Sequence, residues 1–262
     1  MTATDGDIIE HPVLPTVDIL GVPVSRTTMP QAVGTVFNAI RSCKSQYVCV
    51  RDVHGIMHAI DHPDMMDIQR RAAMVTPDGM PLVIVARSRG FRDIERVCGA
   101  DLMDAVCDAS QDEGFKHFFY GGKEGVAELL IERLKARYPR LQVAGSYCPP
   151  FRPLTPEEDD TATRMIRESG AQIVWVGIST PKQEYWMRDH VAHLPGATLL
   201  GVGAAFDFHA GMVKRAPVVM RRLSLEWLHR LASEPRRLWR RYLIMAPKFV
   251  WHVMREKSSV TQ

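Results

Sequence analysis

The sequence predicts an α/β fold, with a mainly parallel, Rossmann-like sheet flanked by helices and a basic helical appendage at the C-terminus. Short β-branched or apolar runs alternate with amphipathic stretches, which is the pattern of βαβ units. The chain has 262 residues and is 46% hydrophobic, enough to bury a full core. Composition changes near Pro217, beyond which arginines and tryptophans accumulate. We therefore expect an α/β catalytic domain over residues 1–217 and a helical appendage over residues 218–262.

The individual elements follow from the same alternation. The predicted strands, in chain order, are Val17–Val24, Gln46–Val50, Ala73–Thr76, His117–Tyr120, Gln142–Ser146, Gln172–Val176 and Thr198–Gly201. The predicted helices between them cover residues 28–42, 53–60, 64–71, 80–88, 100–112, 123–137, 156–168 and 182–191. In the stretch 123–137, for example, Val126, Leu130 and Leu134 recur at the spacing of one helix face.

The C-terminal segment holds most of the positive charge. Residues 221–257 contain ten Lys or Arg and three acidic residues, a local net charge of +7 in a chain whose total is +3. Pro235 and Pro247 predict three short helices, roughly 218–232, 235–245 and 247–256, because proline favours the first turn of a helix. Cationic helices with interleaved tryptophans suit an anionic membrane surface, whereas clustered guanidinium groups also bind diphosphates.

Composition also argues against several classes of protein. No apolar run approaches the roughly 20 residues that a membrane-spanning helix needs. The N-terminal stretch carries acids and prolines where a secretory signal would be basic and then apolar, so we expect a cytoplasmic protein. The five cysteines form no C-x-x-C pair, which argues against a disulfide framework or a structural zinc site.

The sequence Thr76-Pro77-Asp78-Gly79 lies between a predicted strand and a predicted helix. This places Asp78 at the carboxyl end of a strand, where open α/β sheets bind ligands. A carboxylate there can act as a general base toward a hydroxyl. From these four residues alone, a simple turn is the stronger interpretation, with proline at its second position and glycine at its end.

Two later segments are also candidates for ligand contact. Residues 179–184 read Ser-Thr-Pro-Lys-Gln-Glu, and Thr180 with Gln183 fits a capping box at a helix start that could also bind a phosphate. Residues 201–206 begin like a dinucleotide-binding fingerprint, but Phe206 occupies the third glycine position and no obvious helix is expected to follow. We therefore disfavour nicotinamide binding and keep Asp207 as a candidate contact to a ligand.

Metal binding has little support in the sequence. The one Asp-x-Asp triplet, Asp5-Gly6-Asp7, lies close to the N-terminus. His54, His58 and His62 recur every four residues, but no carboxylate completes an obvious ligand set. We expect no divalent metal and no other cofactor.

Seven motifs in order resemble the WecG/TagA/CpsF family of bacterial glycosyltransferases, over about residues 17–243. They are TPDG, RVCGADL, FFYGG, VGISTPKQE, GVGAAFDFHAG, KRAP and LEWLHRLASEPRRLWRRYL. The resemblance implies transfer of a sugar from a nucleotide diphosphate donor, usually UDP-linked, to a polyprenyl-diphosphate-linked saccharide at the cytoplasmic membrane face. It also reverses the interpretation of TPDG, because Asp78 matches the family's catalytic base, which would serve an inverting mechanism.

The resemblance implies roles for further residues. Arg96 and Gln183 match active-site positions, and Arg230, Arg237 and Arg240 resemble diphosphate ligands that could replace a metal. The chain departs from the family where Thr-x-Asn is usual, since it reads Val50-Arg51-Asp52. Asp52 is therefore a substrate-binding candidate that can only accept hydrogen bonds when ionised. The donor sugar stays open between a hexose and an N-acetylmannosamine type, and VRDVHG resembles the exopolysaccharide hexosyltransferase branch.

The end of the chain is the expected membrane contact. Lys248, Trp251, Arg255 and Lys257 lie largely beyond the family motifs and would bind the inner face of the cell membrane peripherally. A homo-oligomer is possible. Two rival hypotheses are a catalytically idle scaffold that docks polysaccharide enzymes on the membrane, and a nucleic-acid-binding protein. The aromatic and aliphatic residues of the basic segment fit nucleic acid poorly.

Overall fold

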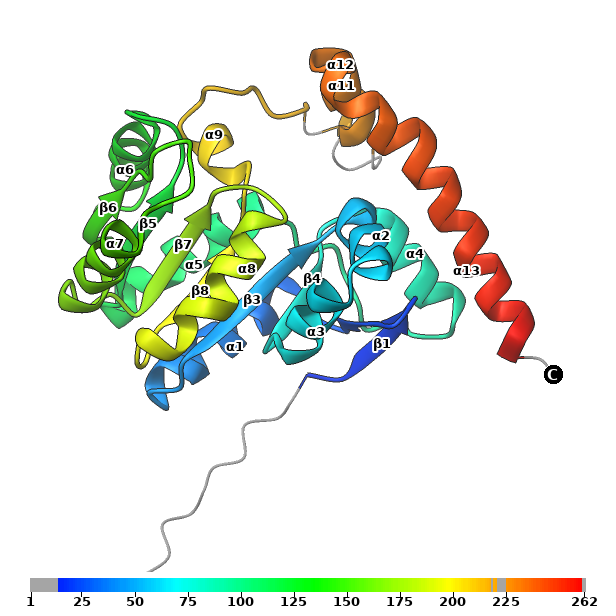
Figure 1. Cartoon of the computed structure of the whole chain (residues 1–262), viewed down its shortest axis with the longest axis horizontal. Helices are drawn as coiled ribbons and strands as arrows, with labels where there is room; N and C mark the ends of the chain where they lie inside the picture. Colours follow the sequence, from blue (N-terminus) through cyan, green and yellow to red (C-terminus); the bar gives the residue numbers. More distant parts are fainter. Residues whose placement is uncertain (1–13, 218, 221–224, 261–262) are drawn as a thin grey trace, which may run out of the picture.

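A six-stranded, wholly parallel sheet forms the centre of the molecule (Figure 1). The computed structural model describes residues 14–217, 219–220 and 225–260. The strands lie in the order β4-β3-β8-β7-β5-β6. Their bounds are β3 Gln46–Arg51, β4 Met74–Pro77, β5 Lys116–Gly121, β6 Gln142–Tyr147, β7 Ile173–Gly177 and β8 Thr198–Gly201. The predicted α/β class, the parallel sheet and these six strands are confirmed.

The first predicted strand is wrong as a single element. Residues 17–24 form parts of a separate antiparallel hairpin, β1 (Thr16–Ile19) and β2 (Val22–Ser25). Leu20 and Gly21 both have positive φ, 55° and 85°, which gives a two-residue turn whose twist matches the strands. The hydroxyl oxygen of Ser25 accepts a hydrogen bond of 3.0 Å from the backbone N–H of Val75. The hairpin is thereby tied to β4, the edge strand of the main sheet.

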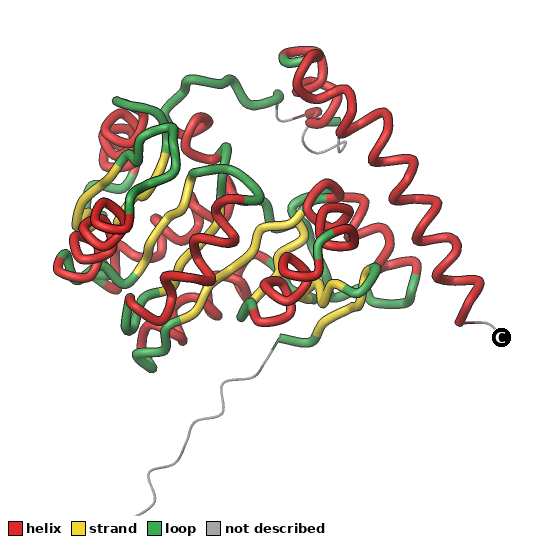
Figure 2. Tube along the Cα trace, viewed as in Figure 1, coloured by secondary structure: helices red, strands yellow, loops and turns green. Residues whose placement is uncertain are grey.

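Helices cover both faces of the sheet (Figure 2). They are α1 Met29–Arg41, α2 Val53–Asp61, α3 Pro63–Arg71, α4 Met80–Ser88, α5 Gly99–Glu113, α6 Val126–Arg137, α7 Pro156–Glu168, α8 Lys182–His190, the 3₁₀ helix η1 Val191–His193 and α9 Ala205–His209. Apolar residues of α3, α7 and α8 pack on one face, and those of α1, α5 and α6 on the other. Strand residues alternate between the two cores: Val174 belongs to the first and Trp175 to the second.

The short helix α9 was not expected after the glycine-rich segment. Within it, Phe206, at the third glycine position, packs its ring against Gly177 at the end of β7 and Gly122 just after β5. A Cβ at Gly177 would lie 2.6 Å from this ring, and one at Gly122 would lie 3.3 Å from it. The glycines of FFYGG and VGIST therefore make room for the phenylalanine of GVGAAF. Three of the sequence motifs thus form one packing contact.

The C-terminal segment contains α11 (Glu226–Ser233), α12 (Pro235–Trp239), the π-helix η2 (Arg240–Met245) and α13 (Ala246–Val260). The predicted break at Pro235 is confirmed, but the break at Pro247 is wrong, because α12, η2 and α13 follow one another without interruption. The π-helical turn changes the hydrogen-bond pattern just before Pro247, where a proline would otherwise interrupt the regular ladder. We call residues 225–260 the tail.

The tail packs against the body of the molecule (Figure 1). Leu238, Phe249 and Val253 are buried. An ion pair of 2.5 Å joins Glu256 to Arg89, at the end of α4. Among the described residues, no helix is both long and apolar enough to span a membrane.

Candidate active site

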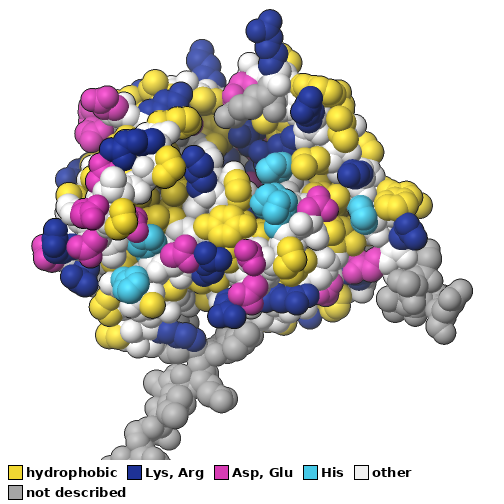
Figure 3. All heavy atoms as spheres, viewed as in Figure 1, with side chains coloured by type: hydrophobic (Ala, Val, Ile, Leu, Met, Phe, Trp, Pro, Cys, Tyr) yellow, Lys and Arg dark blue, Asp and Glu magenta, His cyan; other side chains and the backbone are white. Residues whose placement is uncertain are grey.

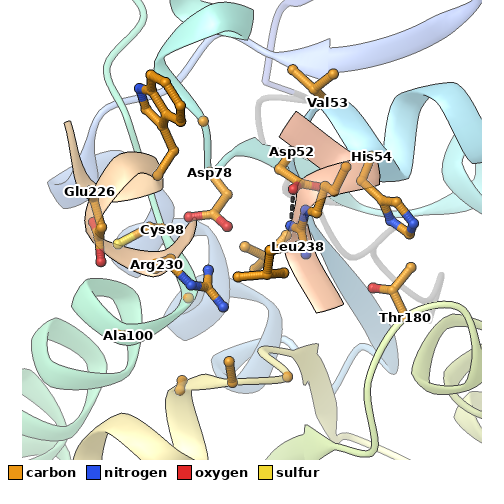
Figure 4. A pocket seen from close by; sticks show the side chains of 18 of the residues that line it. Asp52, Val53, His54, Asp78, Cys98, Ala100, Thr180, Glu226, Arg230 and Leu238 are labelled. Carbon is orange, nitrogen blue, oxygen red and sulfur yellow. Dashed lines mark hydrogen bonds and ion pairs between the residues drawn. The ribbon is translucent and has the colours of Figure 1, made fainter. Parts of the chain in front are cut away.

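A cavity of about 690 Å³ lies between the sheet and the tail. Its floor is formed at the carboxyl ends of β3, β4, β7 and β8 and by the segments that follow them, and residues of α11, α12 and η2 form its roof (Figure 4). Figure 3 shows basic side chains deep in the hollow beside the tail. The sequence-predicted residues that line this cavity are Asp52, Asp78, Arg96, Gln183, Arg230 and Arg240.

Two predicted site residues are not among them. Asp207 lies on α9, outside the cavity lining, and its backbone carbonyl accepts hydrogen bonds from the N–H groups of Met212 and Val213. The side chain of Arg237 lies outside the described part of the structure. The cavity thus gathers residues that lie far apart in the sequence, such as Asp52 and Arg241, which are 189 positions apart.

Asp78 follows directly on β4, and its carboxylate points into the cavity (Figure 4). Its N–H donates to the carbonyl of Arg51 at 2.7 Å, and its own carbonyl accepts from Nε of Arg96 at 2.7 Å. Burial, together with the negative charge of Asp52, raises the pKa of Asp78 to about 6, although Arg96, Arg230 and Arg241 act in the opposite direction. An aspartate of this kind is still mainly ionised at neutral pH and is more basic than an exposed one.

Asp52 has both of its carboxylate oxygens engaged. It is the N-cap of α2, where Oδ1 accepts from the N–H of Gly55 at 3.0 Å. Oδ2 accepts from the guanidinium group of Arg241, an interaction marked in Figure 4. Burial disfavours the charged form of Asp52, but Arg241 and the Gly55 N–H outweigh it and hold the pKa below its usual value. Sequence reasoning missed Arg241, whose one signal was its place in the double arginine after Trp239.

The other cavity arginines differ in how they are paired. An Nη atom of Arg96 contacts Glu226 of α11 at 2.7 Å, and one of Arg215, from the KRAP motif, contacts Asp101 at 2.6 Å. Arg230 and Arg240 have no ion pair with any described carboxylate. The guanidinium of Arg230 lies 5.4 Å from the Phe208 ring centre, and that of Arg240 lies 5.4 Å from the Trp239 ring centre. These two guanidinium groups are therefore available to an anionic ligand.

Gln183 lies on α8 above a buried ion pair. Its Nε2 donates to Oε1 of Glu184 at 2.8 Å, and that carboxylate also contacts Arg51. The Arg51 and Glu184 side chains are 1% and 0% exposed. The predicted capping box is wrong, because the Thr180 hydroxyl donates to Glu184 at 3.2 Å and α8 begins at Lys182 with Pro181 as its N-cap.

Glycines make room for Arg51 of this pair and for Gln183 beside it. A Cβ at Gly55 would lie 2.8 Å from the Arg51 side chain. A Cβ at Gly201 would lie 2.7 Å from Met187 and 3.0 Å from Nε2 of Gln183. The glycine of VRDVHG and the first glycine of GVGAAF therefore serve close packing under the cavity.

The three histidines of α2 and its C-cap lie in a row. The rings of His54 and His58 are 6.5 Å apart, and those of His58 and His62 are 3.9 Å apart. Across the described ranges, no group of three His, Cys, Asp or Glu side chains is arranged to hold a metal ion. Of the three, only His54 lines the cavity.

The cavity can bind an anion beside a carboxylate that is suited to proton abstraction. The family model for the glycosyl transferase WecG/TagA/CpsF family matches residues 17–262 of this chain. The chain belongs to this family. It is therefore an enzyme that transfers a sugar, as the motifs in the sequence predicted. Membership of the WecG/TagA/CpsF family also implies, in general terms, a sugar donor and a lipid-linked acceptor.

Three of the four predicted membrane-contact residues lie on the outer surface of α13. Lys248 and Arg255 are exposed, and Trp251 is 52% exposed with Arg255 over its ring at 4.6 Å. The Lys257 side chain lies outside the described part. Large exposed apolar side chains of the tail are Trp227, Leu228, Trp239, Leu243, Ile244, Val250 and Met254. The tail therefore combines basic and apolar groups on its exposed surface.

Proposed function

We propose that this member of the WecG/TagA/CpsF family is an inverting glycosyltransferase of exopolysaccharide or other cell-surface polysaccharide synthesis. It moves a sugar of hexose or N-acetylmannosamine type from a UDP-sugar to a polyprenyl-diphosphate-linked saccharide. The observation that carries the proposal is Asp78, a carboxylate facing the cavity with its pKa raised to about 6, beside Arg96, Arg230 and Arg241.

Asp78 is the proposed general base. It takes the proton from the acceptor hydroxyl as the hydroxyl oxygen forms a bond to the anomeric carbon. The bond from that carbon to the UDP oxygen breaks on the opposite face, so the configuration inverts and UDP leaves with the bonding electrons. A base with a pKa near 6 is well matched to this task near neutral pH.

Arg230 and Arg240 are the proposed diphosphate ligands, with Arg96 nearby. Guanidinium groups form charge-assisted hydrogen bonds to phosphate oxygens. They can stabilise the charge that develops on UDP as it leaves, a role that divalent metals fill in other transferases. We therefore propose that the reaction needs no divalent metal, so that turnover in the presence of a chelator should equal turnover without it.

The tail is the proposed contact with the cytoplasmic face of the membrane. Its basic groups suit anionic lipid headgroups, and its exposed tryptophan and aliphatic side chains suit the interfacial region. The tail also roofs the cavity. A lipid-linked acceptor held at that surface would therefore meet the catalytic base.

The test is a transfer assay with a panel of UDP-sugars and a short-chain lipid-diphosphate saccharide, read by product mass. One donor should give a product one sugar heavier, and Asp78→Asn should lower its turnover by roughly 10² to 10⁴-fold because the base is lost. Asp93→Asn is the matched control, since that carboxylate is exposed and pairs with Arg26. Near-normal turnover by Asp78→Asn would contradict the role of Asp78. No turnover by the unmodified protein with any donor would favour the idle scaffold.

A further inference from the structure

The contact between Asp52 and Arg241 joins the catalytic end of β3 to the tail. Arg241 lies in η2, the π-helical turn of the tail, and its guanidinium group binds Oδ2 of Asp52. Both residues line the cavity and are largely buried, with side chains 23% and 28% exposed. Ion pairs in such places are screened less by salt than exposed ones. Each carboxylate oxygen of Asp52 thus accepts a hydrogen bond from within the protein, one from α2 and one from the tail.

Arg241 also acts on the proposed base. The positive charge of its guanidinium group interacts with the carboxylates of both Asp52 and Asp78. The charged groups that act on Asp78 are Asp52 at the end of β3, Arg96 ahead of α5, Arg230 on α11 and Arg241 on η2. Cys98 and Tyr242 are further titratable groups on which the charge of Asp78 acts. Asp52 opposes ionisation of Asp78, whereas the three arginines favour it.

We propose that Asp52 and Arg241 form a latch that holds the tail over the cavity and, by the same contact, sets the charge environment of Asp78. Both are positioning residues in this proposal, which rests on the proposed role of Asp78 as the base. The latch depends on the charged carboxylate of Asp52, because the neutral amide of an asparagine could not form an ion pair with Arg241. Closure of the tail and the ionisation of Asp78 are thereby coupled.

The experiment compares Asp52→Asn, Arg241→Gln and the control Arg89→Gln. Arg89 ties the tail to the body through Glu256 but does not line the cavity, so its loss loosens the tail without changing the charges around Asp78. Hydrogen exchange of residues 235–256 reports tail closure and requires no catalysis. The acid limb of the pH profile of turnover reports the pKa of Asp78, the proposed base.

Hydrogen exchange in the tail should be faster in Asp52→Asn and in Arg241→Gln than in the unmodified protein. Relative to Arg89→Gln, the acid limb should move in opposite directions in the two variants, by about one pH unit. It should move to lower pH in Asp52→Asn, because a like charge is removed from beside Asp78. It should move to higher pH in Arg241→Gln, because an opposite charge is removed.

Two results would overturn the latch. Unchanged exchange in both variants would show that the contact does not hold the tail. In the second result, the acid limbs of Asp52→Asn and Arg241→Gln move in the same direction and by the same amount as the acid limb of Arg89→Gln. This would show that loss of the ion pair only opens the tail and that the pair does not change the pKa of Asp78. If the unmodified protein transferred no sugar, the proposed function would fail, while the exchange data would still decide whether the contact holds the tail.

Discussion

Asp78 obtains its chemistry from its surroundings at the end of β4. Burial and the neighbouring Asp52 oppose its ionisation, and three arginines favour it. The balance leaves a carboxylate that is more basic than usual yet still ionised at neutral pH. A turn with the same four residues on an open surface would have none of these neighbours, which is why TPDG alone is ambiguous.

The pH dependence of turnover should reveal this carboxylate. Protonation removes the base, so activity should fall as the pH drops through about 6, the pKa of Asp78. One pH unit lower, about a tenth of the maximal rate should remain. The measurement is turnover from pH 4.5 to 8 with saturating UDP-sugar, and a rate that stays constant down to pH 5 would contradict the assignment.

At the scale of elements, the functional segments are joined by close packing. Phe206 of α9 fits against Gly122 and Gly177, at the ends of β5 and β7. Gly99, at the start of α5, packs so closely on Val202 that a Cβ would lie 3.2 Å from its carbonyl oxygen. The segments at the carboxyl edge of the sheet therefore pack closely against one another.

The exposed side of α13 should bind anionic membranes. The double variant Trp251→Ser and Met254→Ser removes two exposed apolar side chains, 52% and 65% exposed, so it should leave the fold intact. Binding to vesicles that contain anionic phospholipid should weaken on the order of tenfold or more, since less apolar surface enters the interface. Flotation with vesicles measures this effect.

Phe151→Ser is the matched control for that experiment, because Phe151 is a fully exposed apolar residue on the body, between β6 and α7. Vesicle binding by this control should equal that of the unmodified protein. Equal binding by the double variant would show that α13 is not the membrane contact.

At the scale of the whole molecule, the tail forms part of the lining of the candidate active site. It supplies Glu226, Arg230, Arg240 and Arg241 to the cavity and buries Leu238 against the body. Neither the sheet nor the tail encloses the cavity alone. The two parts of the chain on either side of Pro217 differ in composition, but both contribute residues to the same cavity.

Removal of residues 218–262 should abolish both turnover and vesicle binding. Turnover should fall by roughly a hundredfold or more even with a water-soluble acceptor, because the arginines of the roof are lost. The truncated protein should also expose the apolar surface that covers Phe249 and Val253, which binding of a hydrophobic dye would detect. Full turnover of a soluble acceptor by the truncated protein would make the tail an anchor only.

Local patterns were sufficient for most of the sheet, because buried parallel strands read as short apolar runs between helical stretches. They were insufficient for the hairpin, where the turn at Leu20-Gly21 lies inside an apolar run, and for Pro247, where a π-helical turn precedes the proline. For the site, the motifs indicated Asp78, Arg96 and Gln183. They could not indicate Arg241, because it is one of several arginines in the tail. Nothing in the neighbouring sequence shows which of them contacts Asp52.

The sequence by itself determined the α/β class, the glycosyltransferase family and the basic character of the tail, since these depend on residue types and their order along the chain. Only the tertiary structure decided that Asp52 faces Arg241 and that Arg51 pairs with Glu184 beneath the cavity. It also decided that Phe206 serves packing and that Asp207 lies away from the cavity. Such contacts join residues far apart in sequence, and their energies depend on burial and distance, which no local pattern contains.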